Sequence, residues 1–318
     1  MSCKEQVLVE IFPTQEEVEV CCDTGKESLL VEACFNVRDW LPSDVPIASW
    51  YDGADEDTIT ESGGKVSQWD DKSPREIPVI QTNGSDQPSY GTRTLNGLNV
   101  LDFDGNSFLR ATNFEFETSD LLIAVVYEAD SVYSQFNSVY SLTNDFSPEE
   151  GFQFQAAENS RFVGELAKKD GANVNPSNGP YPGPAINVAE FNLSGNFAAT
   201  YYNGLLDGIE ENFQDITVFR DFKIFSNRLT TSPLNGACAE LIVSYDTSPE
   251  KRQLLEGYLA CKWGLQSELP NDHTYKTACP TIGEGCEDQI LVDVDSGLES
   301  VEVSIHKEKE SVLVEGCL

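Results

Sequence analysis

Four acidic residues gather in one short stretch of the chain. Asp52, Asp55, Glu56 and Asp57 follow a run of apolar and aromatic residues. Carboxylate oxygens are the ligands that Ca²⁺ prefers, so Asp52, Asp55 and Asp57 are a candidate calcium site. The alternative is a solvated acidic loop, which the large excess of acid in this chain favours. No other cofactor is indicated.

A second stretch has the composition of a saccharide-binding loop. Residues 171–185 read GANVNPSNGPYPGPA, and so many Pro, Gly and Asn residues predict an exposed loop. Tyr181 can stack on a sugar ring, and Asn175 and Asn178 can bond to its hydroxyls. These three residues are candidate glycan contacts. The alternative is a long connection that binds nothing.

Catalytic groups are scarce in this sequence. The chain has two histidines, His273 and His306, and no G-x-S-x-G, phosphate-loop or H-E-x-x-H motif. An imidazole base with an orienting partner, or a zinc site rich in histidine, is therefore not expected. The sequence predicts a protein that is not an enzyme.

The cysteines are numerous and regularly placed. Nine are many for a protein made in a reducing cytosol, and an odd number leaves one without a partner in the chain. Cys3 and Cys34 are 31 residues apart, and so are Cys286 and Cys317. This equal spacing suggests two equivalent disulfides, whereas buried free thiols at duplicated core positions are the alternative.

The spacing of these cysteines belongs to a repeat that brackets the chain. Residues 3–35 and 286–318 align without a gap and are identical at 15 of 33 positions, which indicates a duplication. Each copy predicts three short strands, at 7–11, 18–22 and 28–34 in the first copy. A three-stranded meander of this size buries too little to be stable alone.

Two copies packed on each other would form a small β domain from both chain ends. Apolar residues alternate with acids in the predicted strands, so each strand has one apolar face. The expected core of this domain consists of Leu8, Val18, Val20, Leu30, Leu291, Val301, Val303 and Leu313. We therefore expect a discontinuous base domain of residues 1–40 and 279–318. The alternative is that each copy is an arm reaching a neighbouring subunit.

Residues 41–278 predict a separate all-β domain. Short alternating runs separated by Gly, Asn and Asp turns recur in this part, and Asn203-Gly204 is a strong hairpin signal. One helix is expected, with Ser248 as N-cap, Pro249 in the first turn and an end near Gly264. Many short strands with little helix predict a jelly-roll β-sandwich.

Three stretches of this middle part resemble a known family. They are residues 48–73 (ASWYDGADEDTITESGGKVSQWDDKS), 98–105 (LNVLDFDG) and 237–276, which contains GYLACKWGL followed by LP and H-x-Y-K. The combination is similar to the concanavalin A-like, laminin-G-like lectin/glucanase domain found in many phage and environmental bacterial proteins. The resemblance implies two curved antiparallel sheets, with Trp50, Trp69 and Trp263 in the core of the domain.

The same resemblance bears on insertion and on catalysis. The two ends of such a sandwich lie close together, so the domain can be inserted into a loop of another domain. A glucanase of this fold class carries paired carboxylates, commonly as E-x-D-x-x-E on one strand. This chain has Glu128-Ala129-Asp130 without the third acid, so a glucanase is not expected.

The chain is strongly acidic, with 20 Lys and Arg against 54 Asp and Glu and a net charge of −34. Such a charge disfavours nucleic acids and anionic membranes as partners. The N-terminal residues MSCKEQVLVEIFPTQEE contain acids where a signal peptide has an apolar core, so general secretion is not expected. A protein that is assembled in a host cytoplasm and exposed on a virion surface reconciles these features with the cysteine content.

We therefore predict a structural protein of a virion, in particular a phage head decoration (cement) protein. Its base domain would bind the major capsid protein and neighbouring copies of itself. Its lectin-like domain would face outward and contact host-surface polysaccharide. The alternatives are a phage tail or baseplate receptor-binding protein, a bacterial surface adhesin, and a polysaccharide hydrolase, although the last lacks the paired acids.

Overall fold

The chain divides into two compact units in the computed structural model. The base unit comprises Met1–Trp40 and Thr281–Leu318, and the sandwich unit comprises Leu41–Pro280. The residues that the structure describes are 6–11, 17–20, 28–33, 38–117, 120–131, 137–142, 151–156, 162–167, 173–174, 183–192, 195–211, 218–231, 233–282, 289–293, 300–306 and 311–317. The six long strands of the base unit are described by their backbone.

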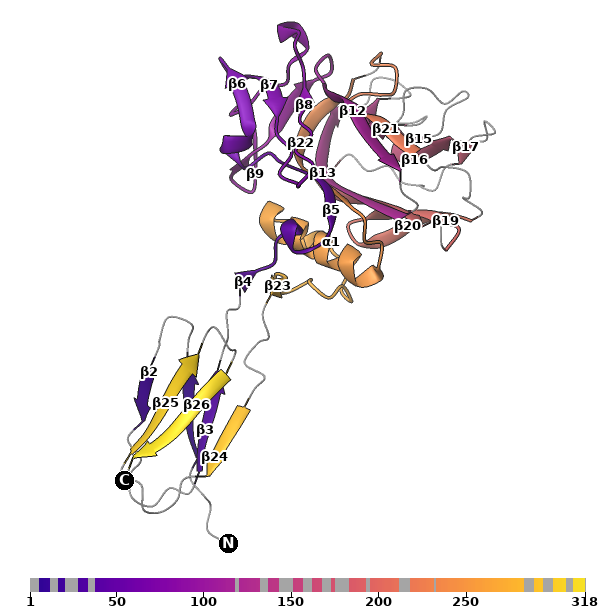
Figure 1. Cartoon of the computed structure of the whole chain (residues 1–318). Coiled ribbons are helices and arrows are strands. Elements are labelled where there is room, and N and C mark those ends of the chain that lie inside the picture. The colour runs from indigo at the N-terminus through magenta and orange to yellow at the C-terminus, as the bar shows by residue number, and fades with distance from the viewer. Residues whose placement is uncertain are drawn as a thin grey trace. The chain divides into compact units, whose positions relative to one another are not determined.

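Strands from both ends of the chain lie side by side in the base unit (Figure 1). They are β1 (Gln6–Ile11), β2 (Glu17–Val20), β3 (Ser28–Ala33), β24 (Gln289–Asp293), β25 (Ser300–His306) and β26 (Ser311–Cys317). One sheet has the order β1-β3-β24 and the other β2-β25-β26. A further antiparallel pair joins β4 (Arg38–Asp39) to β23 (Thr281–Ile282).

Each sheet of the base unit mixes strands of the two repeats. β1 runs parallel to β3, and β24 of the second repeat pairs antiparallel with β3. β2 pairs antiparallel with β25, which also pairs with β26. The expectation of one meander per repeat is therefore wrong. The central strand of one sheet, β3, comes from the first repeat, and that of the other, β25, from the second.

The apolar positions expected in the base core fall on these strands. The register pairs Leu8 with Leu30, Leu30 with Leu291, Val18 with Val303, Val20 with Val301, and Leu313 with Ser304. Aliphatic residues of the two repeats are thus neighbours across the sheets. Their side chains lie outside what the structure describes, so their role as a core stays a prediction.

The sandwich unit is an all-β sandwich, as the sequence predicts. Its larger sheet has nine strands, in the order β17 (Asn173–Val174), β16 (Phe162–Ala167), β15 (Gly151–Ala156), β14 (Ser138–Leu142), β21 (Val218–Ile224), β12 (Leu109–Glu117), β8 (Val79–Ile80), β7 (Lys65–Trp69) and β6 (Ile59–Ser62). The second sheet has seven strands, in the order β11 (Leu101–Asp104), β22 (Asn235–Ser244), β13 (Asp120–Ser131), β18 (Ala185–Asn192), β19 (Phe197–Tyr202) and β20 (Leu205–Glu211), with β5 (Ile47–Asp52) also paired to β22.

Short elements and one long helix complete the sandwich unit. The short ones are a hairpin of β9 (Thr94–Leu95) and β10 (Leu98–Asn99) and the 3₁₀ turns η1 (Pro42–Asp44), η2 (Glu56–Thr58), η3 (Gly84–Asp86) and η5 (Gln266–Glu268). The helix is α1 (Pro249–Trp263), which contacts β13 and β18 on the seven-stranded sheet (Figure 1). In the described part of the chain, no helix combines the length and apolarity that a membrane crossing needs.

The boundaries of α1 confirm the signals read from the sequence. Ser248 is the N-cap residue in extended conformation and Pro249 occupies the first turn. The helix stops at Gly264, which adopts the left-handed conformation with φ of 72°. This conformation is accessible to glycine at little cost, because glycine has no Cβ.

The two sheets face each other across an aromatic core. Phe103 stacks on Phe225 with ring centroids 4.3 Å apart, and Trp69 is fully buried in the same core. Trp50 and Trp263 are 6% and 1% exposed. The predicted burial of the three tryptophans is therefore confirmed.

Candidate functional site

A pocket of about 500 Å³ opens where β18 begins and where β19 and α1 end. The described residues that line it are Leu95, Asn96, Gly183, Pro184, Tyr202, Trp263, Gly264, Leu265 and Glu268. Two aromatic rings, a proline ring, two leucines, one amide and one carboxylate therefore share one concave surface. The pocket therefore offers polar as well as apolar surface to a small molecule.

Asn96 reaches the pocket from a tight turn. Asn96 and Gly97 join β9 to β10 with φ angles of 50° and 76°, which is typical of a type I′ turn. Asn96 Nδ2 donates to the carbonyl of Lys262, in the last turn of α1, at 2.9 Å. Gly264 permits this approach, because a Cβ there would lie 2.9 Å from Asn96 Cγ. Asn96 Oδ1 accepts no hydrogen bond from the described residues.

Tyr202 stands beside the hairpin turn between β19 and β20. Asn203 and Gly204 have φ angles of 47° and 82°, so the predicted type I′ hairpin is confirmed. Asn203 ties this turn to β18: its N–H donates to the carbonyl of Ile186, and its Oδ1 accepts the N–H of Ile186, both at 2.8 Å. Burial, and secondly the charge of Glu268, raise the pKa of the half-buried Tyr202 phenol.

The indole of Trp263 is hydrogen-bonded to a buried carboxylate. Glu240, on β22, is fully buried and accepts four hydrogen bonds. The donors are Trp50 Nε1 at 2.7 Å, Trp263 Nε1 at 2.7 Å, Lys262 Nζ at 2.9 Å and Tyr258 OH at 3.0 Å. Three of these donors belong to α1, so one carboxylate holds the end of the helix, and with it a wall of the pocket, on the sheet.

Two lysines balance this carboxylate and its acidic neighbours. Lys262 Nζ also lies 2.6 Å from Asp52, and Lys72 Nζ lies 3.2 Å from Asp52 and 2.6 Å from Asp55. Burial raises the pKa of Glu240, and Lys262 opposes that rise. Burial lowers the pKa of Lys72, but Asp55 and Asp52 raise it by more, so it lies above its usual value. The result is a chain of alternating charges that runs from Glu240 through Lys262, Asp52 and Lys72 to Asp55.

This network contains two of the three residues expected to bind calcium. Asp52 and Asp55 each contact a lysine ammonium group, which repels a second cation. Asp57 lies in η2. Across the residues described, no three His, Cys, Asp or Glu side chains come together as a set of metal ligands. The geometry therefore gives the calcium hypothesis no support.

The predicted glycan contacts Tyr181, Asn175 and Asn178 lie outside the described residues, so their role stays a prediction. Their loop nevertheless leads to the pocket, because the residues that connect it to β18, Gly183 and Pro184, belong to the lining.

Sequence reasoning missed the lining residues Asn96, Tyr202 and Glu268. They lie on three separate segments that meet only in the folded chain. The one local signal was the Asn203-Gly204 turn, which places Tyr202 at the end of a strand. Trp263 was expected in the core and is buried there, but its ring also lines the pocket.

The H-x-Y-K motif fastens the segment that follows α1. His273 Nε2 lies 3.1 Å from Oε2 of Glu256, a fully buried residue of α1. Lys276 Nζ donates to the carbonyls of Ser267 at 2.7 Å and Leu269 at 2.6 Å. The first contact holds this segment on α1, and the second ties it to η5, which carries the carboxylate of the pocket.

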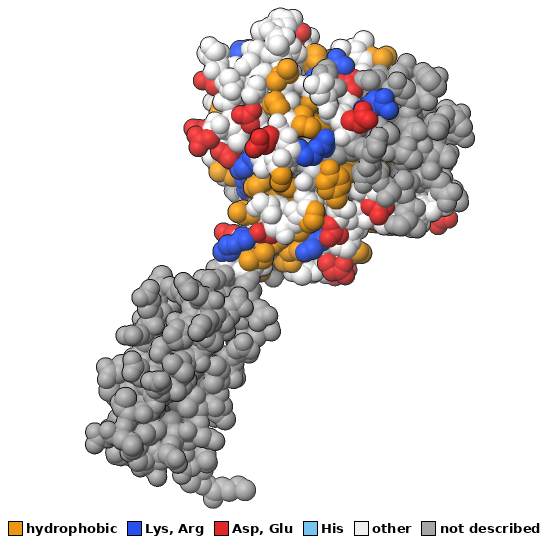
Figure 2. All heavy atoms as spheres, viewed as in Figure 1, with side chains coloured by type: hydrophobic (Ala, Val, Ile, Leu, Met, Phe, Trp, Pro, Cys, Tyr) orange, Lys and Arg blue, Asp and Glu red, His pale blue; other side chains and the backbone are white. Residues whose placement is uncertain are grey.

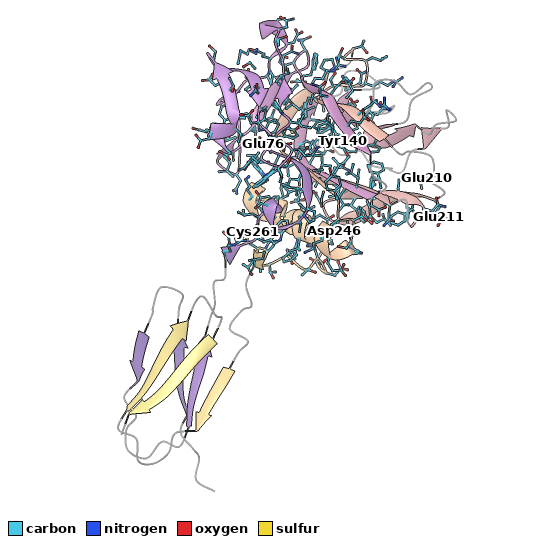
Figure 3. The ribbon with its side chains drawn as sticks, in the orientation of Figure 1. Glu76, Tyr140, Glu210, Glu211, Asp246 and Cys261 are labelled. Carbon is cyan, nitrogen blue, oxygen red and sulfur yellow. A yellow bond between two sulfur atoms is a disulfide. The ribbon has the colours of Figure 1, made fainter. Side chains whose placement is uncertain are left out.

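A disulfide adds a covalent link to the same segment. It joins Cys261, which lies on α1 (Figure 3), to Cys279, with Cα atoms 5.7 Å apart and a sequence separation of 18. The loop that it closes contains the pocket residues at the end of α1 and in η5. The sequence analysis did not pair these two cysteines, because neither belongs to the repeat.

The four cysteines expected to pair within the repeats are not tested by the structure. Cys3, Cys34 and Cys286 lie outside the described residues, and Cys317 is described only by its backbone in β26. Cys238 is a buried free thiol of the sandwich core. Disulfides and free thiols therefore stay open as alternatives for the two repeats.

The E-x-D acids contact an arginine. Arg93 Nη2 lies 2.7 Å from Glu128 and 2.7 Å from Asp130, and Arg93 Nη1 donates to Asp130 at 2.8 Å. Glycoside hydrolysis needs two carboxyl groups that flank the scissile bond. Two acids that share one guanidinium are not in that arrangement, and Glu268 is the only carboxylate among the described lining residues of the pocket.

A second polar cluster lies on the nine-stranded sheet. Asp221, with a φ of 53°, accepts from Arg110 Nε at 2.5 Å and from Lys223 Nζ at 2.8 Å. Burial lowers the pKa of Lys223, and Asp221 opposes this. The buried hydroxyl of Ser141 and that of Tyr140, labelled in Figure 3, have no hydrogen-bond partner among the described residues. Asp221 and Lys223 are almost fully shielded from solvent, so their charges face each other inside the domain.

Comparisons with known proteins extend only to overall shape. No protein-family model matches the chain, and no curated protein matches it. It is similar to domain 4 of an extracellular arabinanase from Geobacillus stearothermophilus in complex with arabinotriose, with 12% identity and a TM-score of 0.49 over 65% of this chain and 96% of that one.

Two further solved structures are similar at a lower level. The CBM40 domain of Ruminococcus gnavus IT-sialidase, bound to α2,3-sialyllactose, has 12% identity and a TM-score of 0.35 over 48% of this chain and 93% of that one. The receptor-binding domain of botulinum neurotoxin type G has 11% identity and a TM-score of 0.42 over 65% of this chain and 49% of that one. Likeness at this level carries no argument about function.

Proposed function

We propose that the sandwich unit binds a saccharide in the pocket formed by α1, the β9–β10 turn and the end of β19. The observation that carries the proposal is the half-buried ring of Tyr202 beside the amide of Asn96 and the carboxylate of Glu268 on one concave surface. Sugar rings present C–H faces that pack on aromatic rings and hydroxyls that bond to amides and carboxylates. The volume of about 500 Å³ lies within the usual range of small-molecule pockets.

The walls of the pocket are held in place without a ligand. The Glu240 carboxylate orients the indole of Trp263, and the capping bond of Asn96 fixes the β9–β10 turn on α1. Lys276 holds η5 through two carbonyls. A site with walls that are already ordered loses little conformational entropy on binding.

The proposed role is binding without hydrolysis. A glycosidase needs a second carboxyl group across the scissile bond, about 5 to 9.5 Å from the first. Among the described lining residues Glu268 has no such partner. The pocket therefore supports recognition, with Glu268 as a hydrogen-bond acceptor for sugar hydroxyls.

The experiment that tests this is a glycan array probed with the full chain, followed by titration of the best ligand. Tyr202→Ala removes the stacking ring and is expected to weaken binding at least tenfold, or about 1.4 kcal/mol. Tyr245→Ala is the matched control, because Tyr245 is an exposed tyrosine that does not line the pocket. Equal affinities for the wild type and Tyr202→Ala would refute this site.

The finer proposal is that the chain is a phage head decoration protein. In this proposal the base unit binds the major capsid protein and neighbouring copies, and the sandwich unit contacts host-surface polysaccharide. It is supported by the sharing of strands between both chain ends, which makes the base unit one body. Many copies on one particle would raise the avidity of a weak site.

Copy number in purified particles tests the location. A mass-spectrometric census that finds hundreds of copies per virion fits the head, whereas a handful fits a tail or baseplate receptor-binding protein. Recovery from a bacterial cell surface instead would support an adhesin. In the binding assay, Tyr181→Ala tests whether the loop before Gly183 contributes, with Asn175→Ala and Asn178→Ala as its polar counterparts.

A further inference from the structure

We infer that the pocket selects neutral and amino sugars and rejects sugars that carry a carboxylate or sulfate; this selectivity rests on the proposed saccharide binding. Three features of the site carry the inference: the charge of its lining, the helix end that borders it, and the engagement of the nearest lysines.

Among the described lining residues one side chain is charged, and its charge is negative. Glu268 is exposed, and the other described lining residues are uncharged. The segment that leads into Gly183, residues 175–182, also contains no charged residue in its sequence. A sugar acid bound here would place its carboxylate near Glu268, and the described lining residues include no cation to compensate.

The end of α1 adds negative potential to the same pocket. Trp263 is the last residue of the helix and Gly264 is its C-cap, and both line the pocket. The unpaired carbonyls at a helix C-terminus carry about half a negative elementary charge. Asn96 Nδ2 caps the carbonyl of Lys262, one of the last four carbonyls of the helix. The helix end therefore attracts cations and repels anions.

The lysines closest in sequence to the pocket residues are engaged elsewhere. Lys262 Nζ contacts Asp52 at 2.6 Å and Glu240 at 2.9 Å, so its charge is balanced twice. Lys276 Nζ donates to the carbonyls of Ser267 and Leu269. Neither lysine is among the residues that line the pocket.

The electrostatic field of the whole chain is negative, like the local charge at the pocket. The chain carries 54 acidic against 20 basic residues, and Figure 2 shows acidic side chains on the same face as the basic ones. At physiological salt this long-range field is screened within about 8 Å, so the local charges decide the selectivity. A cationic amino group on the sugar is attracted to Glu268, and a neutral hydroxyl donates to it.

The test uses the full chain and matched ligands that differ in charge alone. An array of neutral, amino and acidic glycans first identifies a bound backbone, and glucose, glucosamine and glucuronate oligomers of equal length are then titrated. Glucuronate is expected to bind at least tenfold more weakly than glucose, and glucosamine at least as tightly as glucose. Raising the salt concentration is expected to narrow this difference.

Charge variants distinguish the effect of the charge in the pocket from the effect of the net charge of the chain. Glu268→Gln is expected to reduce the discrimination, and Glu268→Lys to invert it in favour of glucuronate. Glu250→Lys is the matched control: it makes the same change in net charge at an exposed residue in the first turn of α1 and is expected to leave the preference unchanged. Melting temperatures of the variants report whether they fold.

Each outcome decides one of the two proposals. Equal binding of the matched ligands, or a preference for the acidic ones, overturns the selectivity and leaves saccharide binding intact. A preference for neutral and amino sugars that persists unchanged in Glu268→Lys also overturns it. Failure to bind any glycan on the array overturns both proposals together.

Discussion

The indole N–H of Trp263 donates to the carboxylate of Glu240 at 2.7 Å. Trp263 lines the pocket, whereas Glu240 lies on β22 and is fully buried. This bond therefore couples the packing of α1 on the sheet to the shape of the proposed binding site. A change at Glu240 is expected to alter both stability and ligand affinity although Glu240 touches no ligand.

Replacing Glu240 by alanine is expected to lower the free energy of unfolding by about 3 to 5 kcal/mol. The substitution leaves two indole N–H groups and the Lys262 ammonium without their buried acceptor. Urea unfolding followed by tryptophan fluorescence measures the change. Glu250→Ala, at an exposed position of the same helix, is the control and is expected to change stability by less than about 0.5 kcal/mol. A loss below about 1 kcal/mol for Glu240→Ala would show that other contacts hold the helix.

The pH dependence of stability has a predicted sign. Burial raises the pKa of Glu240 above the 4.5 of an exposed glutamate. At a pH between 4.5 and the raised pKa of the folded state, Glu240 is protonated in the folded chain and ionised in the unfolded chain. The contribution of Glu240 to stability therefore falls as pH rises through that range. The fall amounts to about 1.4 kcal/mol for each unit by which the pKa is raised.

Comparison with Glu240→Gln isolates this contribution. The difference in unfolding free energy between the wild type and Glu240→Gln is expected to decrease as pH rises from 4.5 and to level off above the folded-state pKa. The charge of Asp52 also raises the pKa of Glu240. Asp52→Asn is therefore expected to lower the folded-state pKa of Glu240 and to shorten the pH range over which the difference in unfolding free energy decreases. A difference that increases with pH would show that Lys262 outweighs burial.

Gly257→Ala is expected to destabilise the sandwich unit by about 1 to 3 kcal/mol. A Cβ on Gly257 would lie 2.5 Å from Cγ of Tyr275, so the H-x-Y-K segment would have to move away from α1. Gly84→Ala is the matched control, because a Cβ on Gly84 meets nothing within 4 Å. Thermal unfolding measures both variants, and equal melting temperatures would contradict the close packing of Tyr275.

Reduction of the Cys261–Cys279 disulfide is expected to lower the free energy of unfolding by about 3 kcal/mol, from the entropy of a loop of 18 residues. Peptide mapping without reductant should recover the two cysteines as one linked pair. Cys238 is expected to react with alkylating reagents only after unfolding, because burial shields the thiol and raises its pKa. Alkylation of Cys261 in the native, unreduced chain would contradict the pairing.

The sandwich unit is expected to fold without the base unit. A fragment of residues 41–280 contains both large sheets and the disulfide, so it should melt cooperatively as a β protein. Its melting temperature should lie within a few degrees of the corresponding transition in the full chain. A fragment that aggregates until the chain ends are restored would contradict the division into two units.

Signals that act between neighbouring residues were readable from the sequence. Ser248 and Gly264 bound α1, and Asn203-Gly204 turns β19 into β20, because capping and turn formation depend on local backbone preferences. The alternation of apolar and polar residues predicted the strands of an all-β sandwich, because it too is a pattern between neighbouring residues.

Contacts between residues that are far apart in the sequence could not be predicted from the sequence. Asp52 looked like a metal ligand, but its charge is met by Lys262, 210 residues away. The mixing of the repeats into two sheets depends on which strand edges meet, and residues with equal strand propensity do not specify that. The described residues of the pocket come from four separate segments of the sandwich unit, so the pocket exists only once the sheets and α1 are assembled.

The pairing of β2 with β25 has an internal symmetry. Glu19 lies opposite Glu302, its own counterpart in the second repeat, and Val18 faces Val303 while Val20 faces Val301. Exchanging the two repeats reproduces this pairing, so a single unduplicated repeat would meet a second copy of itself in the same register. The symmetry is limited to this pair of strands, because β25 also pairs with β26, whereas β3, the counterpart of β26, pairs with β1 and β24 in the other sheet. Each sheet needs strands from both repeats, so loss of either chain end would leave both sheets of the base unit incomplete.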